Sequence, residues 1–293
     1  MTTHVVSFSE LSSIRQCRLQ AHLSYRERWR TETVSAALSR GKLFHAVMEA
    51  RNRAKCATLS GDGEKRAVDP YDVLKEAEGS YDEDVIETVT WMLEGYEEQW
   101  GEDSQWDILA VEEKVEDWLR LPSGRRSQFK LKGFVDLLVR DRSAGGGLWV
   151  VDYKTCRELP KRKALDFDDQ FGIYIWLLRK KGLDVRGCIY SAVRTNKLKR
   201  SMTLDERFCT EYTVRTDREL EVMAGEALET FRSAYGVGVR GQVGGDKLPP
   251  RSPDPDRCGW RCPFTESCLM SRKGRDIREL LAETGFTQSY ERH

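Results

Sequence analysis

Two acidic positions at the ends of successive apolar segments most constrain what this chain can form. Asp136 ends the first segment, and the triplet Asp152-Tyr153-Lys154 ends the next, sixteen residues later. Alternate residues of a strand share a face, so Asp152 and Lys154 are expected to point to one side and Tyr153 to the other. Burying an unpaired carboxylate costs about several kcal/mol, so each aspartate needs a compensating charge.

Carboxylates from two strands can bind a hard divalent cation, and a lysine beside them can contact a phosphate. Such a cation prefers oxygen ligands and retains water molecules, one of which can become a nucleophile. The alternative is a structural ion pair of Asp152 with Lys154 or Arg140. The spacing of the acidic residues favours the metal site and predicts cleavage of phosphodiester bonds.

The net charge gives no indication of a nucleic-acid partner. Lys and Arg together number 48, as do Asp and Glu, so the chain of 293 residues has no global positive field. Three basic clusters flank the acidic segments; each alone indicates a solvated surface, and together they favour a groove that follows phosphates. These clusters are Arg125, Arg126, Lys130 and Lys132; Lys161, Arg162 and Lys163; and Arg194, Lys197, Lys199 and Arg200.

The sequence shows neither a secretory leader nor an apolar run of membrane-spanning length. We therefore expect no membrane partner and a cytoplasmic location, which is the host cytoplasm if a phage encodes the protein. In such a reducing compartment, eight cysteines argue against a disulfide framework.

Hydrophobic periodicity predicts helices early in the chain and strands in its middle. Helices are expected over residues 7–30, 37–59, 71–100, 167–181 and 216–235. The range 71–100 can hold either one helix or two. Ser9 or Ser12 would cap the first. Strands are expected over residues 108–119, 129–140, 148–155, 185–194 and 208–214. This order predicts an α/β core with a mixed central sheet.

Four consecutive regions are expected to form one structural unit. They are an N-terminal helical region over residues 1–105, a core over 106–240, a cysteine segment over 241–270 and a polar tail over 271–293. The composition of the tail indicates partial disorder.

Further site residues are suggested by position. His45 lies on the second expected helix, where an isolated histidine is more often an ordinary core or surface residue than a ligand. Glu112 and its neighbour Glu113 occupy opposite faces of a strand, and we favour Glu112 for the cation. Gln170 and Tyr174 share a face of the helix after the lysine strand, which an ordinary amphipathic helix would also explain.

The cysteines form a second informative group. Cys258, Cys262 and Cys268 cluster near the end of the chain, and Cys17 on the first helix can supply a fourth thiolate. Four thiolates suit zinc or an iron–sulfur cluster, and the spacing does not choose between them. Linking the two ends would close a loop of more than 200 residues, so the group would be a structural clasp. The remaining cysteines, interpreted as core thiols, are Cys56, Cys156, Cys188 and Cys209.

The order of these motifs resembles the RecB/AddB-like nucleases of the PD-(D/E)XK superfamily. The resemblance is greatest to the stand-alone iron–sulfur branch, which includes the CRISPR-associated Cas-four exonucleases and related phage proteins. It covers residues 7–269 and rests on seven weak motifs in one order. They are Cys17, Gly41 to His45, Glu112, Gly133-x-x-Asp136, Asp152-x-Lys154, Gln170-x-x-x-Tyr174 and the three-cysteine cluster.

The resemblance implies a restriction-endonuclease-like core and a role for each matched residue. It implies Mg²⁺ or Mn²⁺ bound by His45, Asp136, Asp152 and the Tyr153 carbonyl. Lys154 would position the attacking water, Glu112 would assist, and Gln170 and Tyr174 would be an accessory pair. A [4Fe–4S] cluster would be held by Cys17, Cys258, Cys262 and Cys268. The chain departs from the pattern in having Asp152 where many relatives have Glu, and three residues rather than two between Cys258 and Cys262.

These observations predict a metal-dependent DNA exonuclease acting on single-stranded ends, in recombination, repair or CRISPR-type DNA processing. No Gly-x-x-x-x-Gly-Lys-Ser/Thr motif is present, so a helicase or recombination partner would supply any motor. A homo-oligomer is equally compatible with the sequence. Two alternatives are a non-catalytic DNA-binding subunit of a recombination complex with a four-cysteine metal site, and a zinc-stabilised interaction protein.

Overall fold

The structure, a computed structural model, describes residues 3–31, 35–60, 68–101, 105–143, 145–196, 202–236 and 248–289. The chain divides into two compact units. The first comprises Met1–Val34, Trp118–Leu131 and Ala224–His293, and the second Ser35–Asp117 and Lys132–Met223. Lys197, Lys199 and Arg200 of the third basic cluster lie outside the described residues.

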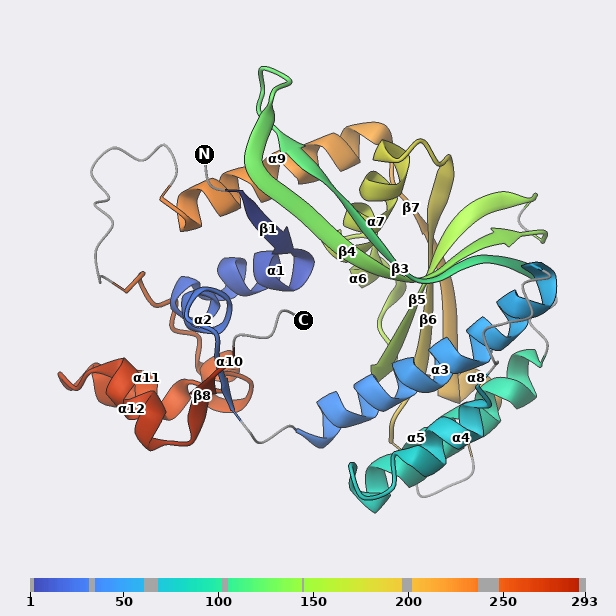
Figure 1. The fold of residues 1–293 in the computed structure, drawn as a ribbon, viewed down its shortest axis with the longest axis horizontal. Helices are drawn as coiled ribbons and strands as arrows, with labels where there is room; N and C mark the ends of the chain where they lie inside the picture. The colour runs from blue at the N-terminus through green and yellow to red at the C-terminus, as the bar shows by residue number, and fades with distance from the viewer. Residues whose placement is uncertain are drawn as a thin grey trace. The chain divides into compact units, whose positions relative to one another are not determined.

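The central sheet is mixed, as the sequence predicted. Its strands are β1 (His4–Ser7), β3 (Trp106–Arg120), β4 (Arg126–Asp141), β5 (Gly147–Cys156), β6 (Val185–Arg194) and β7 (Phe208–Val214). Their order is β1-β4-β5-β6-β7, with β3 paired to β4 (Figure 1). β5 and β6 are parallel, whereas β4–β5 and β6–β7 are antiparallel. The parallel pair needs a crossover, which contains α7 (Asp169–Lys180).

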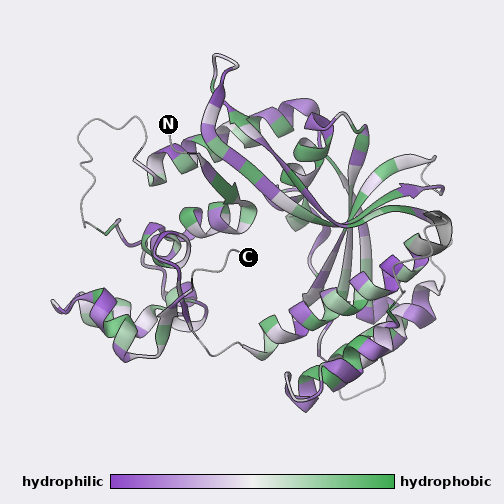
Figure 2. Cartoon of the chain, in the orientation of Figure 1, coloured by the Kyte–Doolittle hydropathy of each residue, from purple (hydrophilic) through white to green (hydrophobic). Residues whose placement is uncertain are grey.

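Helices of the second unit cover one face of this sheet. They are α3 (Ala36–Ser60), α4 (Pro70–Glu76) and α5 (Glu83–Trp100). In α5, Val85, Val89, Met92 and Tyr96 are buried at helical spacing, and Figure 2 shows this helix with hydrophobic and hydrophilic residues together. These residues pack in one core with β-strand side chains such as Val151. The core thereby fixes α3, which carries His45, against the sheet.

Helix α7 packs on the other face. The ring of Phe171 in α7 lies 5.7 Å from that of Tyr190 in β6. Ile189, the neighbour of Tyr190, belongs to the core under α3 and α5. Because neighbouring residues of a strand face opposite sides, α3 and α7 lie on opposite faces of the sheet (Figure 1).

The N-terminal helix expected over residues 7–30 is interrupted. The structure has α1 (Phe8–Gln16), α2 (Arg18–Ala21) and the π-helix η1 (His22–Arg26) in its place. Cys17 between α1 and α2 is extended, with φ −158° and ψ 114°, so the helical hydrogen bonding stops there. Ser7, rather than Ser9 or Ser12, caps α1 by accepting a hydrogen bond from the Glu10 amide.

The polar tail is folded where the structure describes it, which corrects the expectation of disorder. The C-terminal elements are α10 (Pro255–Trp260), α11 (Thr265–Ser271), α12 (Ile277–Glu283) and β8 (Phe286–Gln288). Ile277 and Leu281 are buried with Leu19 and Leu23 from the N-terminal helices. β8 also pairs antiparallel with β2 (Trp29–Thr31). A few apolar residues at helical spacing are sufficient for this packing, although the mean composition is polar.

The remaining helices are α6 (Arg162–Leu165), α8 (Leu204–Arg207) and α9 (Asp217–Ala234). Among the helices that the structure describes, none combines the length and apolar character required to span a membrane.

Candidate metal centre

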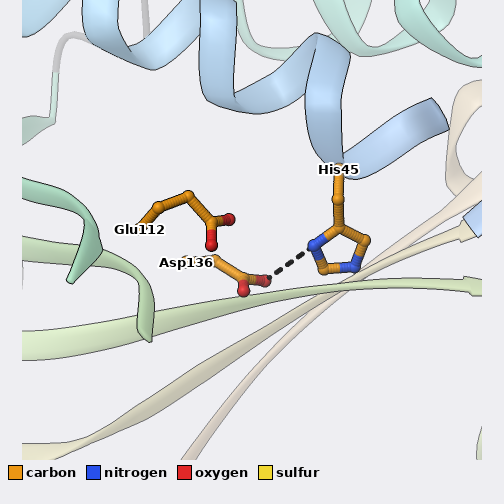
Figure 3. A group of neighbouring side chains, drawn as sticks. All are labelled: His45, Glu112 and Asp136. Carbon is orange, nitrogen blue, oxygen red and sulfur yellow. Dashed lines mark ion pairs between the residues drawn. The ribbon is translucent and has the colours of Figure 1, made fainter. Parts of the chain in front are cut away.

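Three potential metal ligands converge from three elements of the second unit. His45 comes from α3, Glu112 from β3 and Asp136 from β4, and their ligand atoms all lie within 4.8 Å of one another (Figure 3). His45 Nδ1 is 3.5 Å from Asp136 Oδ2. Opposite ligands of an octahedral Mg²⁺ ion are about 4.2 Å apart. Small side-chain adjustments would therefore bring all three onto one cation.

Glu112 reaches this group through an unusual backbone conformation. Its φ of 51° lies in the left-handed region, which a glutamate rarely adopts. The next residue, Glu113, instead accepts a hydrogen bond from Lys181 at 3.2 Å. The structure thus directs Glu112 and not Glu113 to the centre, as the sequence favoured. Conformational strain of this kind commonly accompanies functional sites.

Asp152 and Lys154 point to the same side of β5. Asp152 is fully buried, and Lys154 Nζ lies 2.8 Å and 2.7 Å from its two carboxylate oxygens. Tyr153 points the other way into the core, where Asn52 donates a hydrogen bond to its hydroxyl. The ion pair left open as an alternative is therefore formed, and it lies within the candidate centre.

Asp136 is held next to Asp152 by the backbone. The Tyr153 amide donates a hydrogen bond of 2.7 Å to Asp136 Oδ2. The regular β4–β5 register ends with the pair Leu137 and Val151, one residue before the two aspartates. The aspartates therefore lie where β4 and β5 stop pairing, so both carboxylates can face a common space.

The three carboxyl groups of the centre have raised pKa values in the absence of a cation. Burial raises the pKa of Asp136 and of Asp152 to about 6. Burial, then repulsion from Asp136 and Glu49, raises the pKa of Glu112 to about 7. The positive charge of a bound divalent ion would offset both the cost of burying these carboxylates and the repulsion between them.

The basic groups have complementary protonation states. Burial, then the nearby Lys154 ammonium, lowers the pKa of His45, which favours the neutral imidazole that metals bind. Burial lowers the pKa of Lys154, but attraction to Asp152 and Asp136 outweighs burial and leaves the pKa raised. The centre therefore combines a neutral histidine with a firmly protonated lysine.

Gln170 and Tyr174 are brought together on α7. Gln170 Nε2 donates a hydrogen bond of 2.7 Å to the Tyr174 hydroxyl. Burial, then the negative charge of Asp152, raises the pKa of Tyr174 well above its usual value, so the phenol keeps its proton. The Tyr174 ring also explains why position 133 is a glycine, because a Cβ at that position would lie 2.9 Å from Cε1 of the ring.

Glu49 is a residue that the sequence reasoning missed. It follows His45 by four positions on α3, so the two share a helix face. The negative charge of Glu49 contributes to the raised pKa of Glu112. Glu49 also forms an ion pair with Arg53, whose Nε lies 2.7 Å from Glu49 Oε1. Its spacing of four residues from His45 was the sequence feature that could have identified Glu49 as a neighbour of the site.

The four cysteines proposed as ligands line a single cavity in the first unit. This cavity of about 340 Å³ is bordered by Cys17, Cys258, Cys262 and Cys268. Among the described residues, no three cysteine sulfurs lie within 4.8 Å of one another, whereas sulfurs of a tetrahedral zinc site are about 3.8 Å apart. All four are free thiols. The other cysteines differ in burial, with Cys188 fully buried and Cys56, Cys156 and Cys209 partly buried.

Comparison with known proteins shows the family of this chain. The family model described as the PD-(D/E)XK nuclease superfamily matches residues 5–269. The chain belongs to this superfamily. Nucleases of this superfamily use divalent metals, so the hydrolase class and metal dependence expected from the sequence are confirmed at superfamily level.

Two solved structures are similar to this chain. One is a protein of Eubacterium rectale named as a candidate exonuclease, with 11% identity, a TM-score of 0.45, and coverage of 79% of this chain and 81% of that one. The other is SSO0001, with 15% identity, a TM-score of 0.34, and coverage of 88% and 93%. No significant match is found among curated proteins.

Proposed function

We propose that the protein is a metal-dependent DNA exonuclease that acts on single-stranded ends. The observation that carries the proposal is the convergence of His45, Glu112 and Asp136 near the Asp152–Lys154 pair. The exonuclease assignment rests on the order of motifs that resembles the RecB/AddB-like branch. Superfamily membership supports hydrolysis of phosphodiester bonds.

The donor set fits Mg²⁺ or Mn²⁺, because carboxylate oxygens predominate and a neutral imidazole accompanies them. We assign His45, Asp136, Asp152 and the Tyr153 carbonyl as ligands, with Glu112 assisting. When bound, the ion supplies Lewis-acid charge at the scissile phosphate and lowers the pKa of water.

The other residues orient substrate and water. The Lys154 ammonium, kept protonated by Asp152 and Asp136, would position the attacking water and stabilise charge on the phosphate. The Tyr174 phenol, fixed by Gln170, would donate a hydrogen bond to the DNA backbone.

The resemblance to the iron–sulfur branch, together with the cavity that the four cysteines border, supports an iron–sulfur cluster as our assignment. All four cysteines border one space, and no three of their sulfurs lie within 4.8 Å of one another. We assign Cys17, Cys258, Cys262 and Cys268 to a [4Fe–4S] cluster that joins the N-terminal and C-terminal segments. Its role would be structural.

We place this activity in DNA recombination, repair or CRISPR-type processing. Because the sequence has no phosphate-binding loop for ATP, a separate helicase would open duplex ends. The alternative of a non-catalytic DNA-binding subunit would use the Asp152–Lys154 ion pair only for structure.

A cleavage assay distinguishes these functions. End-labelled single strands are incubated with Mn²⁺ and with wild type, Lys154→Ala or Lys75→Ala. Lys75 pairs with Asp72 on α4 and is a charge-matched control outside the candidate centre. We expect Lys154→Ala to reduce the rate by about 100-fold or more, with Lys75→Ala unchanged. Equal degradation by wild type and Lys154→Ala would contradict a catalytic role.

A further inference from the structure

Two phenylalanines next to the candidate metal centre are exposed to solvent. Phe167 is 87% exposed and Phe134 is 44% exposed, whereas Phe44, Phe129 and Phe171 are fully buried. An exposed ring contributes little to folding, because it removes little apolar surface from water. Their position therefore needs an explanation other than stability.

Phe167 lies at the start of α7. It precedes Asp168, which caps the helix by accepting a hydrogen bond from the Gln170 amide. A residue at this place often packs on the fifth residue after it, but here that residue is Gly172. Gln170, whose amide binds the Asp168 cap, also donates a hydrogen bond to the Tyr174 hydroxyl, and the Tyr174 ring lies against Gly133, three residues before Asp136. The ring is thus beside the centre and lacks a partner side chain at the usual helical position.

Phe134 lies two residues before Asp136 on β4. Its neighbour Gly133 faces Tyr174 of α7, and the Phe134 ring itself is exposed to solvent. The Lys132 ammonium lies 5.9 Å from the centre of the Phe134 ring. An exposed aromatic ring and a cation therefore lie together on β4, two residues before the proposed metal ligand Asp136.

We propose that Phe134 and Phe167 stack on unpaired bases on the two sides of the scissile phosphate and so select single-stranded DNA. The inference rests on the proposed nuclease function. Aromatic rings beside cations are how proteins bind single strands without reading sequence, and Lys161 and Lys163 near Phe167 are also exposed. In a duplex the faces of the bases are already covered by their neighbours.

The test measures binding without cleavage. Ca²⁺ replaces Mg²⁺, and fluorescence anisotropy gives the dissociation constant of the full chain for a labelled oligothymidylate strand, an abasic strand of equal length and a blunt duplex. The variants are Phe134→Ala, Phe167→Ala and the conservative Phe167→Trp. Val214→Ala, which alters an apolar side chain that is 62% exposed on β7, is the matched control.

We expect each alanine variant to bind oligothymidylate about 5- to 100-fold more weakly, from the usual contribution of one stacked base. Binding of the abasic strand should change less than twofold, and Phe167→Trp should bind at least as tightly as wild type. Val214→Ala should match wild type with every ligand. Melting temperatures within two degrees of wild type would exclude unfolding.

Unchanged affinity of both alanine variants for oligothymidylate, or equal losses with the abasic strand, would overturn the inference. Preferential loss of duplex binding would also overturn it. Absence of Mn²⁺-dependent cleavage by wild type would instead contradict the nuclease function, and the anisotropy result would still decide whether the rings stack on bases.

Discussion

Asp136, Asp152 and Glu112 are each harder to ionise than an ordinary carboxylic acid. The pKa values are about 6 for the two aspartates and about 7 for Glu112, above those of an unfolded chain. Protonation of these groups therefore stabilises the metal-free fold. This contribution is complete below about pH 4 and is lost as the pH rises through 6 to 7.

A divalent ion should replace those protons, which predicts a pH-dependent response. We expect Mn²⁺ to raise the melting temperature more at pH 8 than at pH 5.5, because protons compete for the ligands at the lower pH. Differential scanning fluorimetry at both pH values, with and without Mn²⁺, measures this. Asp136→Asn should abolish most of the difference. A shift that is equal at both pH values would argue against carboxylate ligands.

Gly133 offers a test of the Tyr174 position. In Gly133→Ala the new methyl group would lie 2.9 Å from the Tyr174 ring, so the ring must move away. We expect a loss of stability of about 1–3 kcal/mol, measured by urea unfolding, and slower cleavage. Gly225→Ala in α9 is the matched control, because a Cβ there meets nothing within 4 Å. If both variants behave like wild type, Tyr174 does not pack on β4 as described.

At this scale the sequence identifies residues better than it predicts their geometry. Alternation along a strand predicted that Glu112 and Glu113 point in opposite directions, and the structure directs Glu112 to the centre and Glu113 to Lys181. The positive φ of Glu112 was not predictable, since it depends on how β3 and β4 bend together. Glu49 was missed because its electrostatic effect on Glu112 acts between segments far apart in the sequence.

At the scale of elements, strand prediction was accurate where hydrophobic runs are buried. The bounds of β6 and β7 agree with those expected from the sequence. The break at Cys17 was missed because its neighbours favour helix, and an extended residue there is a tertiary effect. The fold of α12 was missed because few apolar residues define it.

The packing of α12 can be tested by one substitution. Leu281 is fully buried, so Leu281→Ala should cost about 2–5 kcal/mol in the free energy of unfolding, from the lost contacts and the cavity. Glu279→Ala on the exposed side of the same helix should cost less than about 0.5 kcal/mol. Urea titration of both variants measures the difference. Equal effects would contradict the packing of α12 and favour the partial disorder that the composition of the tail indicated.

At the scale of the whole molecule, the first unit is assembled from segments at both ends of the chain and one between them. A cluster bound by Cys17 and the C-terminal cysteines would covalently join those ends. The sequence could suggest this from cysteine positions, but the shared cavity required the structure.

Iron content tests this assignment. Protein purified anaerobically should be brown and contain about four iron atoms per chain. Cys258→Ser and Cys268→Ser should lose most of the iron, whereas Cys209→Ser, outside the cavity, should retain it. Colourless wild type containing zinc would refute an iron–sulfur cluster, and retention of iron by all variants would refute the ligand set.

The most direct measurement for the whole account is isothermal titration of Mn²⁺ into the wild type and Asp136→Asn. If His45, Asp136, Asp152 and the Tyr153 carbonyl bind the metal with Glu112 assisting, wild type binds Mn²⁺ at a saturable site and the variant binds it at least about tenfold more weakly. Equal affinities, or no saturable binding by wild type, would contradict the account.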